Sequence, residues 1–154
     1  MSISKINGET IIAASGGGYS LRGTLAGATS NPAGATSYYG GASNSTYITT
    51  TADTRRIYIP KAGTIKSCYG FFNQIGSTSG NTGTLYIRLN NTTDYQVGTA
   101  QAHNVNPTLY SGPTLNGGSG ISVTQGNYIE FKWTSPTGNF QPKDMTSSFI
   151  IYIE

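Results

Sequence analysis

Histidine and cysteine, the side chains that most often carry nucleophilic or metal-binding chemistry, each occur once in this sequence, as His103 and Cys68. One histidine cannot form a histidine-rich metal site, and a cysteine–histidine nucleophilic pair would require the fold to join two distant positions. His103 lies where a strand-like segment runs into a loop, so we expect an exposed histidine without a catalytic role. We expect Cys68 to be a buried thiol within a strand, because a lone cysteine forms no internal disulfide.

The acidic residues offer one further candidate for catalysis. There are six of them, each isolated in the sequence: Glu9, Asp53, Asp94, Glu130, Asp144 and Glu154. A glycosidase needs two carboxylates beside one bond, and a sheet could bring Asp94 and Glu130 together for this purpose. Glu130 alternates with Lys132, however, which favours a solvated ion pair across strands. The sequence therefore predicts no enzyme, with no catalytic residue and no metal site.

Composition excludes several other classes of function. The Gly-rich segments 16–18 and 117–120 lack the Lys-Ser/Thr ending of a phosphate loop, so we expect no cofactor. The net charge is +3, but the nine lysines and arginines are scattered and only Arg55 and Arg56 are adjacent, which argues against nucleic acid as a partner. No segment approaches the roughly 20 apolar residues of a membrane span, and no secretion signal is visible. We expect synthesis in a cytoplasm and no membrane partner.

The second part of the chain alternates apolar and polar residues with the period of a half-buried strand. In residues 128–133, Ile129, Phe131 and Trp133 share one face, opposite Glu130 and Lys132. We predict turns at 90–91 and 125–127 and no helix, and hence an all-β antiparallel sandwich, a jelly roll. The predicted strands cover residues 55–59, 65–72, 83–89, 94–102, 108–110, 120–123, 127–134 and 147–153.

The last predicted strand is apolar on both faces, unlike its companions. Phe149, Ile151 and Ile153 lie on one face, and Ile150 and Tyr152 lie on the other. A strand of this kind is usually covered on both sides, which indicates burial between sheets or at a contact between subunits. We predict that Ile150 and Tyr152 contact a second copy of the chain.

Residues 1–51 differ in character from residues 52–154, which we assign to the sandwich domain. They are rich in Gly, Ser and Thr and have little apolar surface, so we predict an extended arm with a hairpin at residues 6–9. Such an arm is ordered by lying across a neighbouring subunit. Deleting residues 2–40 is expected to leave the domain folded. The predicted partner contacts of the arm are Lys5, Ile11, Ile12 and Arg22.

Four blocks of sequence after residue 52 stand out. They are IYIPKAGTIKSCYGFF (57–72), TLYIRLNNTTDY (84–95), GISVTQGNYIEFKWTSPT (120–137) and IIYIE (150–154). Together they resemble a family of small jelly-roll domains in virion proteins of tailed bacteriophages. Asn127 stands where the family often has Asp, and residues 138–140 replace its Trp-containing loop.

The resemblance implies a tumour-necrosis-factor-like homotrimer and a non-enzymatic component of the virion exterior. Two placements follow from it. A capsid decoration protein would be anchored to the major capsid protein by its arm, whereas the receptor-binding tip of a tail or head fibre would recognise glycans of the host surface. We favour decoration, because the chain has no shaft-like repeat. The abundant tyrosines suit a glycan-binding patch, although half-buried tyrosines are also ordinary in strands.

Overall fold

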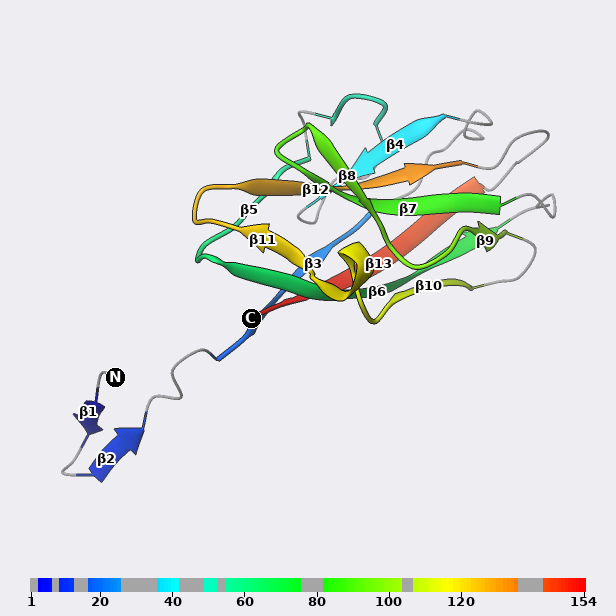
Figure 1. Ribbon diagram of the computed structural model, residues 1–154. Helices are drawn as coiled ribbons and strands as arrows, with labels where there is room; N and C mark the ends of the chain where they lie inside the picture. The colour runs from blue at the N-terminus through cyan, green and yellow to red at the C-terminus, as the bar shows by residue number, and fades with distance from the viewer. Residues whose placement is uncertain are drawn as a thin grey trace.

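The computed structural model describes residues 3–6, 9–12, 17–25, 36–41, 49–52, 55–75, 82–103, 107–135 and 143–154. From Tyr19 onward they form two antiparallel sheets that pack face to face, as Figure 1 shows. The regular structure is mostly β-strand, with a short 3-10 turn at Asn116–Gly118. No helix in this part of the chain is long and apolar enough to cross a membrane. The predicted all-β sandwich is confirmed.

Each sheet is built around two long central strands. The first sheet contains, in spatial order, β10 (Thr108–Gly112), β6 (Gly63–Ile75), β13 (Lys143–Ile153) and β3 (Tyr19–Gly23), and β11 (Ile121–Val123) also pairs with β6. The second sheet contains β4 (Ser37–Gly40), β12 (Tyr128–Thr134), β7 (Thr82–Leu89) and β8 (Thr93–Gln96), with β5 (Ile57–Tyr58) on β12 and β9 (Gln101–Ala102) on β7. A separate hairpin pairs β1 (Ile3–Ile6) with β2 (Glu9–Ile12).

The strand order is that of a jelly roll. The chain changes sheet between β3 and β4, between β5 and β6, between β6 and β7, and again between β9 and β10. It changes sheet twice more, from β10 to β12 and from β12 to β13. As a result the last strand, β13, lies between β3 and β6, and its counterpart β12 lies between β4 and β7. This nesting of the early and late strands is the double Greek key of jelly rolls.

Aromatic rings from both sheets form the core of the sandwich. Phe72 of β6 lies 4.9 Å from Trp133 of β12 and 5.4 Å from Phe149 of β13, measured between ring centroids. Phe149 in turn stacks on Phe131 at 5.0 Å. The inward positions that alternation predicted on β12 and β13 are fully buried. Because the inward residues of both sheets fill this shared core, the alternate residues of each strand face outward, on the two opposite sides of the sandwich.

The predicted boundary between arm and domain at residue 51 is wrong. β3 pairs along its whole length with β13, and β4 pairs with β12. Leu25 and Tyr38 belong to the buried core, and a Cβ at Gly23 would lie 2.3 Å from the Phe131 ring. Strands of four or five residues among glycines are too short for alternation to reveal them. Deleting residues 2–40 would therefore remove two strands of the sandwich.

Two predicted turns agree with the structure, whereas the boundaries of two predicted strands differ from it. The hairpin predicted at residues 6–9 is present, with Ile6 opposite Glu9. The turn at Asn90 and Asn91 is confirmed, and both residues have positive φ. The strand predicted over 94–102 is instead divided into β8 and β9. β13 begins at Lys143 rather than 147, since its pairing with β6 uses backbone groups and needs no apolar pattern.

Candidate functional site

The outward side of the first sheet carries five large apolar side chains that this chain leaves exposed. Leu109 on β10 is 63% exposed, Tyr69 and Phe71 on β6 are 44% and 39% exposed, and Ile150 and Tyr152 on β13 are each 38% exposed. We call these five residues the apolar face.

Strand register makes the apolar face continuous. Leu109 lies opposite Phe71, and Tyr69 lies opposite Ile150, so side chains of three adjacent strands meet on one surface. The prediction that Ile150 and Tyr152 are buried between the sheets is wrong, because no layer formed by the described residues covers them. The other prediction, a contact with a second copy, stays open. Sequence reasoning missed Tyr69, Phe71 and Leu109, although Tyr69 and Phe71 alternate with Cys68 and Phe72 in the same way.

The four predicted arm contacts fall into two separate places. Arg22 lies on β3, in register with Ile150, and so borders the apolar face. Lys5, Ile11 and Ile12 lie in the β1–β2 hairpin, where Lys5 pairs with Thr10. The structure describes the backbone of these three residues but not their side chains. Their role as partner contacts stays a prediction, whereas Arg22 belongs to the sandwich and not to an arm.

His103 is fully buried, so the prediction of an exposed loop histidine is wrong. Its ring packs against Phe72 and Trp133, at 5.7 and 5.2 Å between centroids. Gly83 of β7 makes room for it, since a Cβ there would lie 2.8 Å from Trp133 Nε1 and 3.1 Å from His103 Nε2. The residue follows β9 directly, and the pairing of β9 with β7 carries it inward. A single polar residue at a strand end gives no sequence signal for this.

Tyr110 links His103 to Trp133 by hydrogen bonds. Trp133 Nε1 donates to the Tyr110 hydroxyl at 3.1 Å, so the hydroxyl hydrogen is available for His103 Nε2 at 2.8 Å. When the hydroxyl donates to Nε2, the neutral imidazole carries its proton on Nδ1. Burial lowers the pKa of His103 to about 4 and raises that of Tyr110. The cluster is thus a neutral, satisfied polar group inside the core, with the character of a structural element.

Cys68 is buried on β6, as the sequence predicts. Burial raises the pKa of its thiol to about 12, so the thiolate that nucleophilic chemistry requires is scarce at neutral pH. His103, the other member of the cysteine–histidine pair considered from the sequence, is hydrogen-bonded to Tyr110. Among the described residues, no group of three or more His, Cys, Asp or Glu side chains is placed to hold a metal ion.

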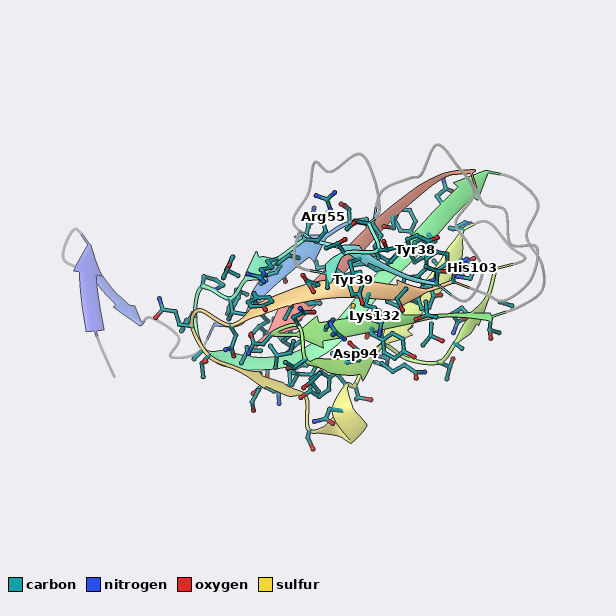
Figure 2. The ribbon with its side chains drawn as sticks, turned by 90° about the horizontal axis from the view of Figure 1, so that it is seen from above. Tyr38, Tyr39, Arg55, Asp94, His103 and Lys132 are labelled. Carbon is teal, nitrogen blue, oxygen red and sulfur yellow. The ribbon has the colours of Figure 1, made fainter. Side chains whose placement is uncertain are left out.

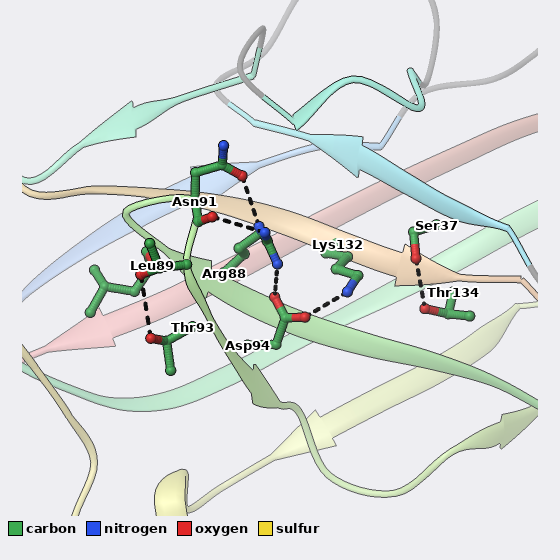
Figure 3. A network of polar contacts seen from close by, with 9 residues as sticks. Ser37, Arg88, Leu89, Asn91, Thr93, Asp94, Lys132 and Thr134 are labelled. Atoms are coloured by element: carbon green, nitrogen blue, oxygen red, sulfur yellow. Dashed lines mark hydrogen bonds and ion pairs between the residues drawn. The ribbon is translucent and has the colours of Figure 1, made fainter.

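The outward side of the second sheet carries a charged network centred on Asp94 (Figures 2 and 3). Arg88 Nη1 donates to Asp94 Oδ1 at 2.7 Å, and Lys132 Nζ donates to Asp94 Oδ2 at 2.5 Å. Partial burial acts to raise the pKa of Asp94, but the hydrogen bonds from Lys132 and Arg88 outweigh it and hold the pKa below its usual value. The carboxylate is therefore charged and acts as an acceptor for two cations.

Glu130 does not form the solvated ion pair across strands that alternation predicted. Its side chain is fully buried, and it lies opposite Arg88 in the β12–β7 pairing. Lys132 instead reaches across β7 to Asp94 on β8. Since Asp94 is already bonded to two cations, its carboxylate is committed to an ion-pair network that fixes the neighbouring strands.

No family model, no curated protein and no solved structure matches this chain.

Proposed function

We propose that this chain is a non-enzymatic structural protein of a bacteriophage virion, a homotrimeric decoration protein of the outer capsid surface. The resemblance of its four sequence blocks to phage jelly-roll domains supports the virion setting. The observation that carries the proposal is the apolar face, which gives the sandwich a surface suited to binding copies of itself.

The composition of the apolar face fits a contact between proteins. Two tyrosines and a phenylalanine are among its five residues, and aromatic side chains are enriched where protein surfaces meet. Arg22 borders it on β3, in the position of a charged rim around an apolar centre. Association of copies around an axis would shield these side chains from water, and each copy would gain stability from burying them.

The N-terminal segment is the proposed anchor to the major capsid protein. β1 and β2 pair only with each other and add no strand to either sheet of the sandwich. A segment of this kind can engage a neighbouring protein without disturbing the fold of the domain. The deletion that tests this role must therefore stop before β3, which begins at Tyr19.

The decisive test of the proposal has two measurements. The first is the mass of the purified protein in solution, which should be that of three chains. The second is the occupancy of virions by a variant lacking residues 2–12, which should keep its circular dichroism spectrum and its mass but lose attachment. A monomeric wild-type protein would refute the trimer, and full occupancy by the shortened variant would refute the anchor.

The receptor-binding tip of a fibre is the second candidate, and the charged second sheet favours it. That surface combines an ion-pair network with tyrosine rings and is independent of the apolar face. A trimer formed through the apolar face would leave it open for a host glycan. In this case purified protein should block adsorption of the phage to its host, which a decoration protein would not do.

A further inference from the structure

The outward side of the second sheet carries cations and tyrosine rings in adjacent rows. In one row, Tyr39 of β4, Lys132 of β12 and Tyr86 of β7 lie side by side across the strands. The Lys132 ammonium is 5.4 Å from the centre of the Tyr86 ring. In the next row, Arg88 lies beside Asp94, with its guanidinium 6.0 Å from the Tyr39 ring.

A third row extends the same surface toward β5. Tyr58 of β5 pairs with Tyr128 of β12, and their ring centres are 5.8 Å apart. Arg56 lies over the Tyr128 ring at 4.3 Å. Tyr58 is 59% exposed, so more than half of its surface is open to solvent. We call the surface formed by Arg56, Tyr58, Arg88, Asp94, Tyr128 and Lys132 the cationic face.

Arg88 and Lys132 are held in place by hydrogen bonds that do not use all of their hydrogens. Arg88 is fixed by Asp94 and by Asn91, whose side-chain and backbone oxygens accept from Nε and Nη2 at 3.0 and 2.8 Å. One hydrogen on each of Nη1 and Nη2 is not used by these bonds. Lys132 gives one of its three hydrogens to Asp94. Figure 3 shows both cations converging on this carboxylate.

We propose that the cationic face is a binding site for an acidic saccharide, with a sugar ring stacked on Tyr58 and the saccharide carboxylate held by Lys132 and Arg88. The face has a net positive charge that fits this ligand, because its three cations outnumber Asp94 and the neighbouring buried Glu130. Rigid aromatic surface and pre-positioned donors are what saccharide binding requires, because they limit the entropy lost on binding.

Nucleic acid fits this face less well. A phosphate backbone places one charge on every nucleotide and calls for a continuous cationic stripe, but Asp94 sits between Arg88 and Lys132. A saccharide with widely spaced carboxylates needs only one pair of cations, Lys132 and Arg88, beside Asp94. This proposal does not depend on self-association, since the apolar face lies on the other sheet.

The test is calorimetric titration of the full chain at low salt with oligogalacturonate and with its methyl ester, which keeps the sugar rings and removes the charge. The acid should bind saturably, and the ester at least about tenfold more weakly, the effect of losing one charge-assisted hydrogen bond. Lys132→Gln and Tyr58→Ser should each weaken binding of the acid by about tenfold. Circular dichroism checks that both variants are folded.

Lys66→Gln is the matched control, because it removes the same charge from β6 in the first sheet. It should leave the affinity unchanged. The proposal is overturned if the acid form does not bind, if Lys66→Gln weakens binding as much as Lys132→Gln, or if single-stranded oligonucleotide of equal charge binds as tightly. None of these outcomes alters the mass of the protein in solution, so failure here is distinct from failure of the proposed trimer.

Discussion

The two outer surfaces of the sandwich are built on the same strand geometry but have opposite chemistry. On the first sheet the outward positions are apolar and exposed, as at Tyr69 and Ile150. On the second sheet the outward positions of β7, β8 and β12 include charged residues that are bonded to one another, as at Arg88 and Asp94. Both sheets bury their other side in one shared core. The fold therefore fixes where each surface lies, while the outward residues alone decide what each surface can bind.

The difference between the two surfaces implies that assembly depends on the apolar face only. Ile150→Asp should weaken association by about 30-fold or more, since a carboxylate buried without a partner costs at least about 2 kcal/mol. The measurement is mass by light scattering over a range of concentrations. Leu109→Asp, on the more exposed edge strand β10, should act in the same direction with less risk to folding.

Gln96→Asp supplies the matched control for this prediction. It places the same new carboxylate on an exposed strand position of the second sheet, where no association is expected. A change in mass with Gln96→Asp, or an unchanged mass with both apolar-face variants, would end the distinction between the two surfaces.

The sequence predicted the sandwich because alternation on long strands is a strong signal. The inward triplets of β12 and β13 and the turn at Asn90 were all correct. It failed where strands were short, as at β3 and β4, and where a polar residue was buried, as at His103 and Glu130. Periodicity reports which side of a strand a residue faces, but it does not report what the rest of the chain places over that side. The extent of the apolar face was missed for this reason.

The acid sensitivity of the fold should arise in the layer between the two faces. Burial lowers the pKa of His103 from 6.5 to about 4, so the unfolded chain takes up a proton first as the pH falls. Stability should be intact above pH 6.5 and decline toward pH 4, by about 3 kcal/mol in total. Urea unfolding across this range measures the decline.

His103→Gln tests whether this histidine is the cause. The glutamine oxygen can accept from Tyr110, and the side chain does not titrate, so the variant should show little change between pH 6.5 and 4. His103 is the only histidine in the sequence, which leaves few other groups to titrate there. An unchanged slope in the variant would place the acid sensitivity elsewhere.

The smallest expected effect concerns the cationic face. Asp94→Asn leaves Arg88 and Lys132 close together without their shared carboxylate, and should lower the free energy of unfolding by about 1 kcal/mol at neutral pH and low salt. The loss should shrink at high salt, because screening reduces the repulsion between the two cations. Glu154→Gln removes the same charge from an exposed position and should have no measurable effect on stability.

The pH at which Asp94 acts separates it from His103. The pKa of Asp94 is lowered from 3.8 in the folded chain, so its contribution is present above pH 3.8 and is lost as the pH falls below that value. In the wild-type protein this loss follows the one due to His103, and Asp94→Asn should remove it without changing the decline between pH 6.5 and 4. If Asp94→Asn also changed the mass in solution, the charged surface would take part in assembly, and the division of roles between the two faces would be wrong.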